Sequence, residues 1–419
     1  MIYLILIAGL ILRLININQS LWLDEAITAL TVKNNTLVEI ITNFARGDFH
    51  PPLYYLILKL WSYVFGFSEV ALRFPSVVFG VLTIFYVYKI GGKKFGLVAG
   101  LLMALNPLAV YYSQEARMYS LAAFCVTAAV YYFSVKKWFL WGLFLLIGLY
   151  SDYVVWFMLP VFFILKRRSM AVSLFLVPLL PLLKEQLFTG LQTVAANPLW
   201  GQVVGGLDPK AVPLTIIKFI FGRVSLDNKL LYGAVFGGIA AAYLWLISNA
   251  KNKVHWLWLG VPILTGFLIS FKIPIYSYFR FLFVLPAFIL LVAEGAKNHK
   301  LKICLLCFIS LFSLIWFNSN QKFHREDWRA TVNYVRASGN KVYMPSTAQD
   351  AGLKYYGPNL MVNDRNSIVI GQDKTVFLLR YVQEIFDERD FLRRVLEATG
   401  YHKTEERNFN GIVVWRYEL

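Results

Sequence analysis

Long apolar runs separated by short polar loops dominate this chain. Each run approaches the roughly 20 residues that a helix needs to cross a bilayer core. A lipid-exposed segment must satisfy its own backbone hydrogen bonds, so such runs become helices. We therefore expect a polytopic all-α membrane protein with about eleven transmembrane helices, over residues 2–17, 73–90, 97–112, 118–135, 138–150, 153–165, 170–187, 230–249, 256–270, 280–296 and 302–318.

Composition excludes the soluble classes. Apolar residues make up 58% of the 419 residues and charged residues only 16%, against about 45–50% and about 25% in soluble domains. The net charge of +17 would suggest nucleic-acid binding in a soluble protein. Here the bases lie in short loops between apolar runs, so no nucleic-acid partner is expected. Cys125, Cys304 and Cys307 lie inside apolar runs, which argues against a disulfide framework.

The distribution of lysine and arginine predicts the orientation in the membrane. With the N-terminus in the cytoplasm, five short inner loops carry Lys89, Lys93, Lys94, Lys136, Lys137, Lys166, Arg167, Arg168, Lys251, Lys253, Lys297, Lys300 and Lys302. Cytoplasmic loops are enriched in these residues. Residues 1–12 lack the basic start and cleavage site of a signal peptide, so the first run is expected to remain as a span of a cell-membrane protein.

The run 51–65 is apolar enough to be mistaken for a span. Counting it as one would place the later basic loops outside, so we interpret it as an amphipathic helix on the outer surface, with Lys59, Trp61 and the tyrosines at headgroup level. Residues 25–45 are expected to form a second surface helix. Both belong to a long first outer loop, 18–72.

The composition changes after residue 318. We expect a transmembrane module over 1–318 and a small extracytoplasmic α/β domain over 319–419. The pattern predicts helices at 327–338 and 389–399. It predicts strands at 341–344, 375–379 and 411–417.

The clearest candidate for chemistry is Asp24-Glu25, directly after the first span. Two adjacent acids at a membrane surface are costly unless they work or pair. Asp24 could act as a general base that takes a proton from an acceptor hydroxyl. The alternative is that Asp24 caps the N-terminus of a helix.

Further candidates lie on the same outer side. His50 precedes Pro51-Pro52 and suits a hydrogen bond to a phosphate or a sugar, or a plain helix cap. Glu115 and Arg117 share one short loop, where they bind substrate or form a local ion pair. Arg13 and Arg280 lie at span ends, where an arginine either clamps a lipid phosphate or extends its charge to the surface.

Asp152 is a further outer-face acid between two spans. The sequence has no nucleotide-binding loop and no HExxH motif, and it has no cluster with metal-ligand spacing. Neither a nucleotide nor a metal cofactor is therefore required, although a divalent ion is compatible with this chemistry.

Six short motifs together resemble a known family. They are residues 21–26 (LWLDEA), 50–55 (HPPLYY), 72–76 (LRFPS), 115–119 (EARMY), 280–281 (RF) and 326–329 (EDWR). In this order they are similar to the GT-C glycosyltransferases, in the branch of protein O-mannosyltransferases and the lipid A aminoarabinose transferase. The nearest resemblance is to the prokaryotic dolichyl-phosphate-mannose-protein mannosyltransferase-like family.

This resemblance implies an inverting hexosyl or pentosyl transfer from an undecaprenyl- or dolichyl-type monophosphate donor to a protein, lipid or glycan at the outer face. Asp24 aligns with the family's catalytic aspartate, and Glu25 stands beside it. Glu115 is the second acidic position, and His50, Arg117 and Arg280 hold the donor phosphate. We add Tyr54, Arg13 and Asp152 as further substrate contacts; Phe281 stands where relatives usually carry tyrosine.

Two other function classes remain open from the residues alone. Acids and arginines in membranes also mark the pathways of transporters and lipid flippases, although those usually lie near the midplane of two related halves. A non-catalytic scaffold subunit would have no need of Asp24.

Overall fold

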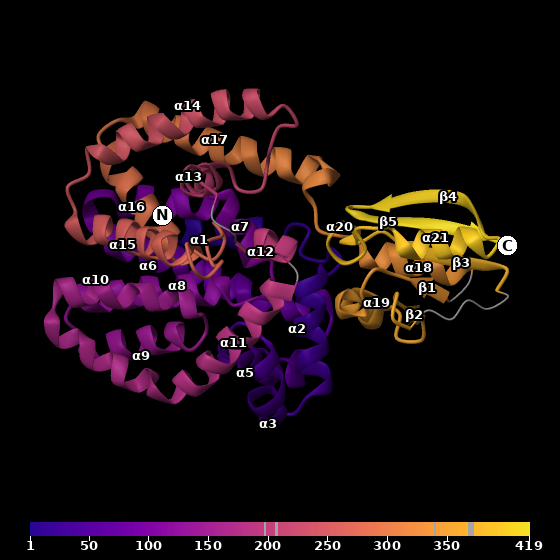
Figure 1. Cartoon of the computed structure of the whole chain (residues 1–419). Coiled ribbons are helices and arrows are strands. Elements are labelled where there is room, and N and C mark those ends of the chain that lie inside the picture. The colour runs from indigo at the N-terminus through magenta and orange to yellow at the C-terminus, as the bar shows by residue number, and fades with distance from the viewer. Residues whose placement is uncertain (197, 206–207, 339–340, 368–372) are drawn as a thin grey trace. The chain divides into compact units, whose positions relative to one another are not determined.

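The computed structural model describes residues 1–196, 198–205, 208–338, 341–367 and 373–419 (Figure 1). The chain divides into two compact units. The first holds Met1–Ile17, Thr36–Gly66 and Val70–Ser319, and the second holds Asn18–Asn35, Phe67–Glu69 and Asn320–Leu419. Two pieces of the first outer loop therefore belong with the C-terminal residues, a grouping that the sequence pattern does not reveal.

The first unit is helical. Its helices are α1 (Ile2–Leu14), α3 (Leu37–Glu39), α4 (Ala45–Gly47), α5 (Leu53–Phe65), α6 (Glu69–Leu105), α7 (Pro107–Ser113), α8 (Tyr119–Ser134), α9 (Trp138–Leu149), α10 (Met158–Leu165), α11 (Leu180–Ala196), α12 (Pro198–Gly205), α13 (Ala211–Phe221), α14 (Lys229–Ser248), α15 (Lys253–Ile269), α16 (Leu285–Ala296) and α17 (Lys300–Ser319). Tighter 3-10 turns precede α10 at Tyr153–Phe157 and α11 at Arg167–Leu179.

The helices confirm a multi-pass membrane protein. Within the described ranges, four helical stretches are long and apolar enough to cross a membrane: Glu69–Leu105, Arg167–Ala196, Lys229–Ser248 and Lys300–Ser319. Eight shorter apolar helices of 10–17 residues accompany them. Helical segments cover each of the predicted apolar runs, and the short ones end where a polar residue or a proline interrupts the run.

Two such interruptions divide α6 and α7. The predicted runs 73–90 and 97–112 meet at Gly92, where φ is 58°, a conformation that glycine adopts without steric cost. The second run ends at Leu105, since the Asn106 side chain accepts a hydrogen bond from Ala109 N at 2.9 Å and caps α7. Pro107 takes the first helical position, where its missing N–H has no cost.

The core of the first unit is built around two helices, α8 and α16. Most residues of both are buried, as expected for helices that are apolar on every side. α8 packs against α9. α16 packs against α14 and α15, and α15 in turn contacts α10 (Figure 1).

The first outer loop differs in detail from its prediction. The expected helix at 25–45 ends at Asn34, because Thr36 and Glu39 cap a new turn by exchanging backbone and side-chain hydrogen bonds. The predicted surface helix 51–65 forms as α5. Its Tyr54 and Tyr55 are buried rather than placed at headgroup level, because both rings pack inside the unit.

The second unit is a small α/β domain. Its elements are α2 (Leu23–Asn34), α18 (Trp328–Ser338), β1 (Lys341–Tyr343), α19 (Ala351–Tyr356), β2 (Met361–Asn363), β3 (Thr375–Leu379), α20 (Gln383–Phe386), α21 (Phe391–Ala398), β4 (His402–Phe409) and β5 (Ile412–Glu418). The sheet order is β2-β1-β3-β5-β4. The β2-β1-β3 pairs are parallel, and the β3-β5-β4 pairs are antiparallel.

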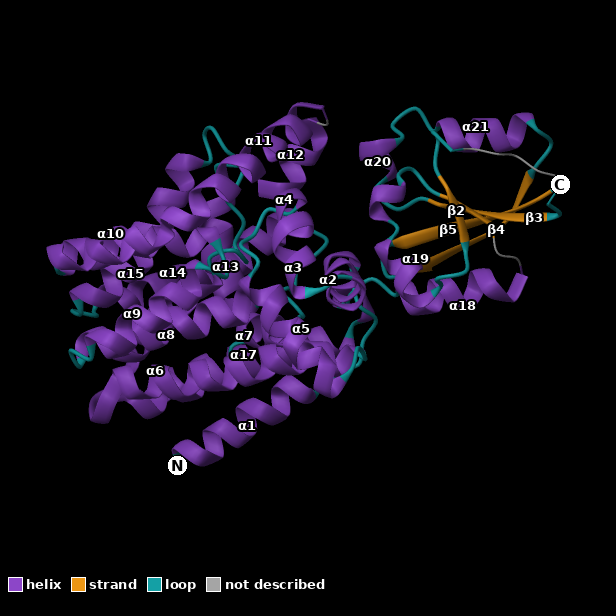
Figure 2. Ribbon diagram, turned by 90° about the horizontal axis from the view of Figure 1, so that it is seen from below, coloured by secondary structure: helices purple, strands orange, loops and turns teal. Residues whose placement is uncertain are grey.

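Helices cover both faces of this sheet, with α21 on one side and α18 on the other (Figure 2). Alternate residues of β3 face them: Val376 and Leu378 join a core cluster with α21, whereas Phe377 packs edge-on against Tyr334 of α18. The predicted helices and the three predicted strands form.

The sequence pattern missed β2 and β4. β4 is an edge strand whose residues are mostly exposed and charged, so it lacks apolar alternation. The hairpin turn between β4 and β5 sets the register in which the two strands pair. In this turn Asn410 and Gly411 have φ values of 51° and 96°. Asn-Gly is the preferred pair for such a tight turn.

Candidate functional site

A cavity of about 300 Å³ lies in the first unit. Apolar side chains form most of its wall, and Leu183, Leu187 and Leu191 contribute a stripe at four-residue spacing along one face of α11. Three residues predicted from the sequence, His50, Asp152 and Arg280, line it. A concave apolar wall with a few converging polar groups is the usual form of a ligand site.

His50 is held by a network of polar side chains. Its Nδ1 lies 3.5 Å from Asp48 Oδ2, and the same oxygen accepts a hydrogen bond from the Tyr55 hydroxyl at 2.7 Å. Arg117 Nη1 donates to the Tyr55 hydroxyl at 3.3 Å. The predicted residue Arg117 therefore connects to His50 through Tyr55 and Asp48.

This network determines the charge state of Asp48. Burial alone would raise the pKa of Asp48, but the charge and hydrogen bond of His50 outweigh it, helped by the charge of Arg117 and the Tyr55 hydroxyl. The net effect lowers the Asp48 pKa to about 2. The ionised Asp48 carboxylate lies beside the His50 ring and fixes its orientation, as carboxylate partners of histidine do.

Asp152 begins the 3-10 turn that precedes α10. Its Oδ1 accepts a hydrogen bond from Val154 N at 3.1 Å, whereas its buried Oδ2 has no hydrogen-bond partner in the described part of the chain. Burial raises the pKa of Asp152, although the charges of His50, Arg280 and Arg117 and the Val154 N–H oppose that change. The carboxyl group is thus held at the cavity with one oxygen uncommitted.

Arg280 lines the same cavity as Asp152. Its Nη1 donates to the carbonyl of Ile275 at 3.2 Å, which orients the guanidinium. Its buried Nε has no hydrogen-bond partner among the residues described. The next residue, Phe281, is fully buried, and its ring lies within 2.2 Å of the point where a side chain on Gly266 would begin. An apolar ring suits this dry position between helices.

Three predicted residues of the first unit lie away from the cavity lining. Arg13 is fully buried and donates to Ser113 Oγ at 3.0 Å and to the carbonyls of Gly9 and Ala104 at 2.9 and 3.2 Å. These bonds join α1 to the ends of α6 and α7, and the substrate contact expected of Arg13 stays a prediction. Tyr54 contacts Ser76, and Glu115 is buried outside the lining.

Asp24 and Glu25 belong to the second unit, at the start of α2. The helix begins at Leu23 with Trp22 as its N-cap, so Asp24 is not the cap. Glu25 is fully buried; its carboxylate lies 3.6 Å from Arg325 Nε and accepts a hydrogen bond from Trp22 N at 3.4 Å. Asp24 is half-buried. The catalytic assignment of these two acids stays a prediction.

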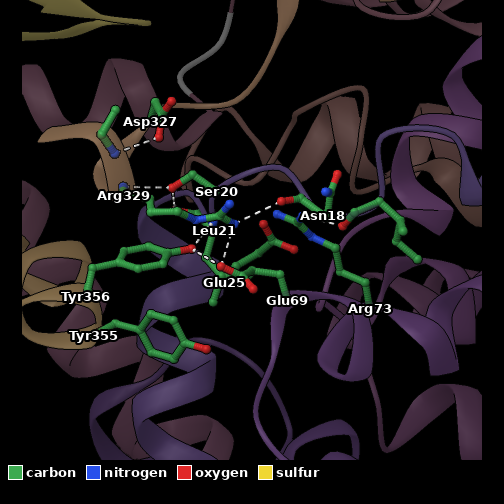
Figure 3. A network of polar contacts seen from close by, with 12 residues as sticks. Asn18, Ser20, Leu21, Glu25, Glu69, Arg73, Asp327, Arg329, Tyr355 and Tyr356 are labelled. Carbon is green, nitrogen blue, oxygen red and sulfur yellow. Dashed lines mark hydrogen bonds and ion pairs between the residues drawn. The ribbon is translucent and has the colours of Figure 1, made fainter. Parts of the chain in front are cut away.

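The start of α2 is fixed by a polar network from the C-terminal part of the sequence (Figure 3). Leu21 N donates to the hydroxyl of Tyr356 at 2.8 Å, and this hydroxyl donates to Glu69 at 2.9 Å. Arg329 contacts the same Glu69 oxygen at 2.5 Å and donates to the carbonyl of Asn18. These bonds explain why residues 18–35 and 67–69 fold with the second unit.

Glu326 completes this region. It accepts hydrogen bonds from Leu23 N, Trp328 Nε1 and the Tyr381 hydroxyl at 3.2, 2.9 and 2.8 Å. Burial raises the pKa of Glu326; the hydrogen bonds oppose this and the nearby charge of Asp24 adds to it. The motif at 326–329, found in the sequence but given no role, therefore holds the α2 terminus.

The sequence missed Asp48, Gln186, Arg325 and Glu326 as members of these two sites. Asp48 could have been found, because it stands two residues before His50. Gln186 follows an apolar run without any motif. Among the residues that the structure describes, no group of three or more His, Cys, Asp or Glu side chains is placed to hold a metal ion.

A comparison with models of known protein families finds a match to part of the sequence. Residues 49–183 match the model of the family described as dolichyl-phosphate-mannose-protein mannosyltransferase. No curated protein matches the sequence. The matched range contains His50, Glu115, Arg117 and Asp152.

Solved structures resemble the whole chain. ArnT from Cupriavidus metallidurans in the apo state has a TM-score of 0.58 and 11% identity, over 99% of this chain and 97% of that one. A second ArnT structure holds undecaprenyl phosphate, at a TM-score of 0.50 and 12% identity. Archaeal oligosaccharyltransferase AglB from Archaeoglobus fulgidus, in complex with an inhibitory peptide and a dolichol-phosphate, has a TM-score of 0.52 and 13% identity, over 99% of this chain and 73% of that one.

The mycobacterial arabinofuranosyltransferase AftD also shares the fold, with a TM-score of 0.51 and 12% identity over 100% of this chain and 39% of that one. At such identities the likeness concerns the fold. The matched family model, the six motifs and this shared architecture agree with one another. The chain has a fold like that of these GT-C glycosyltransferases and is a multi-pass membrane protein with a small C-terminal α/β domain, and its residues 49–183 match the mannosyltransferase family model.

Proposed function

We propose that this protein transfers a single sugar from a polyprenyl monophosphate donor to an acceptor at the outer face of the cell membrane. The observation that carries the proposal is the apolar cavity lined by His50 and Arg280. The proposal is supported by the polyprenyl phosphates held in solved structures of ArnT and AglB.

The cavity offers a suitable place for each part of such a donor. The leucine stripe of α11 and Ile269, Ile273 and Pro274 supply an apolar wall for the first prenyl units. Arg280 and His50 supply cationic donors for the phosphate, and a guanidinium matches phosphate oxygens in a planar fork. Such fixed cations are most effective in a site from which water is excluded.

The proposed reaction is a direct displacement. The acceptor oxygen attacks the anomeric carbon while the bond from that carbon to the phosphate oxygen breaks, which inverts the anomeric centre. Asp24 takes the acceptor's proton as general base. The polyprenyl phosphate leaves with an added negative charge, which Arg280 and His50 stabilise.

Asp24 is favoured over Glu25 as the base because of their different surroundings. The Glu25 carboxylate is fully buried against Arg325 and engaged by Trp22 N–H. Asp24 keeps part of its surface accessible at the first turn of α2. An acceptor hydroxyl requires an accessible carboxylate within hydrogen-bond reach.

Donor binding tests the proposal. Purified protein in detergent is titrated with undecaprenyl phosphate, and Arg280→Ala is expected to weaken binding by about tenfold to several thousandfold, the usual result of truncating one partner of a hydrogen-bonded charge pair. Arg46→Ala is the matched control, because Arg46 is exposed and pairs at 3.8 Å with Glu185 on the same helix as the leucine stripe. Equal affinities for the wild type and Arg280→Ala would refute the phosphate site.

The outer-face location is tested separately. In a variant without Cys125, Cys304 and Cys307, a single cysteine at Ser346 is expected to react with an impermeant thiol reagent in intact cells. One at Lys94 is expected to stay protected until the membrane is opened, because basic loops face the cytoplasm. The reverse pattern would overturn the proposed orientation.

A further inference from the structure

The cavity holds two kinds of uncommitted polar atom. Among the described residues, five buried polar atoms without a hydrogen-bond partner belong to side chains that line this one cavity: His50 Nδ1, which lies 3.5 Å from Asp48 Oδ2, and Asp152 Oδ2, Tyr153 Oη, Gln186 Oε1 and Arg280 Nε. Buried polar atoms are normally paired, so five in one cavity indicate a ligand with matching groups. Arg280 Nε is a donor, whereas Asp152 Oδ2 and Gln186 Oε1 accept hydrogen bonds.

The orientation of the Gln186 amide is fixed by its neighbours. Nε2 donates to the carbonyl oxygens of Ala45 and His50, at 2.5 and 3.1 Å. Carbonyl oxygens only accept, so the nitrogen must occupy this position and both its hydrogens are used. Oε1 is therefore presented as an acceptor, on a side chain that is only 2% exposed.

Asp152 presents a second acceptor in the same way. Its Oδ1 is engaged by Val154 N–H, which fixes the carboxyl plane and leaves Oδ2 for the cavity. The side chain is 2% exposed. Burial raises the Asp152 pKa, as expected when no cation contacts the carboxyl group directly.

Acceptors of this kind cannot serve a phosphate. A phosphate diester has only acceptor oxygens facing the protein, so it would be repelled by Asp152 Oδ2 and gain nothing from Gln186 Oε1. Hydroxyl groups, by contrast, donate to such oxygens. A ligand that satisfies Arg280 and both acceptors must carry an anionic group and hydroxyl donors close together, as a glycosyl phosphate does.

We propose that Asp152 and Gln186 form the sugar subsite of the donor and that each accepts a hydrogen bond from a hydroxyl of its monosaccharide. This inference rests on the proposed function, because it takes the ligand to be a polyprenyl-phosphate sugar. The cations bind the phosphate side of the donor, and the two acceptors bind its sugar side. Tyr153, with its hydroxyl also buried, lies beside Asp152 as a third polar group of this subsite.

The test compares a donor with and without its sugar. Undecaprenyl phosphate, and undecaprenyl phosphates that carry mannose, glucose, galactose or arabinose, are titrated into purified full-length protein. The wild type is expected to bind at least one glycosylated lipid more tightly than the sugar-free lipid. The ratio of these two affinities is the readout.

Asp152→Asn is the sharpest variant. Asn keeps the Oδ1 that accepts a hydrogen bond from Val154 N–H, so its amide nitrogen takes the place of Oδ2. This nitrogen is a hydrogen-bond donor, and it would meet the sugar hydroxyl, which also has to donate. The sugar-dependent part of the affinity is expected to fall by about ten- to a hundredfold, the usual cost of leaving a buried group unpaired. Sugar-free undecaprenyl phosphate is expected to bind at least as tightly as it does to the wild type, because the variant removes a carboxylate that would repel the phosphate.

Asp208→Asn is the matched control, since Asp208 caps Lys210 N at 2.8 Å in the same local geometry but is exposed. Gln186→Met is the second variant and keeps the shape of the side chain without its polar atoms. It also releases the His50 carbonyl, so both affinities fall, but the glycosylated lipid is expected to lose more. Thermal unfolding of each variant confirms that it is folded.

The outcomes separate the two proposals. A wild type that binds neither kind of lipid overturns the proposed function and this subsite together. A wild type that binds undecaprenyl phosphate but gains nothing from any sugar overturns the subsite alone. An unchanged affinity ratio in both Asp152→Asn and Gln186→Met does the same.

Discussion

Two fully buried carboxylates, one in each unit, have opposite surroundings. At the start of α2, both sides of Glu25 are engaged, by Arg325 and by Trp22 N–H. At the cavity, Asp152 uses one oxygen to cap a turn, and the other has no hydrogen-bond partner in the described chain. A buried carboxylate whose hydrogen-bond and charge partners are all present stabilises the fold. A buried carboxylate that lacks a partner for one oxygen lowers stability, and such a group is typical of a ligand site.

The same contrast separates neighbours in the sequence. Asp24 and Glu25 are adjacent, but successive helical residues point about 100° apart, so only Glu25 turns into the core of its unit. Asp24 remains half-buried at the helix start. The pair therefore divides into one structural acid and one partly accessible acid. Substitutions of Asp24 and Glu25 test this division, and substitutions of Asp48 and Asp152 test the acids at the cavity.

The largest effect is expected for Asp24→Asn. Asn keeps the shape of the side chain but removes the base, and general base catalysis is typically worth about 10²–10⁴-fold. Sugar transfer should fall by that factor, while binding of undecaprenyl phosphate stays the same. Asp327→Asn is the control, because Asp327 accepts from Ala330 N at 2.9 Å at the start of α18 and Asn caps as well. A fully active Asp24→Asn enzyme would remove Asp24 from the mechanism.

Glu25→Gln should act on stability. It removes the carboxylate that lies 3.6 Å from the buried Arg325 guanidinium, and breaking a buried ion pair from one side costs about 3–5 kcal/mol. We expect a loss of about 3 kcal/mol, because the amide oxygen can still accept from Trp22 N–H. Chemical unfolding in detergent measures it. A variant as stable as the wild type would show that Glu25 is not a structural acid.

Asp48→Asn should lower stability in a defined pH range. The folded Asp48 pKa of about 2 lies below its ordinary value of 3.8, so the ionised carboxylate stabilises the protein by about 2 kcal/mol at neutral pH. Because the folded pKa is the lower one, this contribution is complete above about pH 4 and is lost as the pH falls toward 2. Wild type and variant should therefore converge in acid unfolding curves. A constant difference at every pH would contradict the network.

The smallest effect, of opposite sign, is expected for the stability of Asp152→Asn. Burial raises the Asp152 pKa above its ordinary value of 3.8. The ionised carboxylate therefore lowers the stability of the folded protein at neutral pH, and this cost disappears as the pH falls below about 4. Removing the charge should raise stability at neutral pH by up to about 1 kcal/mol, as often found when functional residues are replaced. A loss as large as that of Glu25→Gln would make Asp152 a structural acid and erase the contrast between the two units.

Much of the fold was predictable because it rests on local patterns. Apolar runs near span length, basic loops and the change of composition after residue 318 gave the membrane helices and the C-terminal α/β domain. The errors were also local. Asn106-Pro107 broke a run that looked continuous, and the exposed charges of β4 concealed an edge strand.

The candidate site was predictable only in part. His50, Asp152 and Arg280 were each found by their residue type on the outer side of a span, and the structure brings these three to one cavity. The role of Gln186 could not be predicted, because a single glutamine at the end of an apolar run belongs to no recognisable sequence motif. The sequence did not show that Arg13 donates to the carbonyls of Gly9 and Ala104, because an arginine near a helix end has the same sequence signature whichever partner it binds.

The sequence by itself determined which segments become helices and which family the motifs resemble, since these properties depend on hydropathy and on residues near one another in the chain. The side of the membrane that the acids share stays a prediction from charge. Only the tertiary structure decided which polar atoms are paired. Gln186 is oriented by the carbonyl of Ala45, and Glu25 is neutralised by Arg325, from positions far away in the sequence. Whether a buried polar group is complete or left for a ligand depends on such packing, which periodicity does not encode.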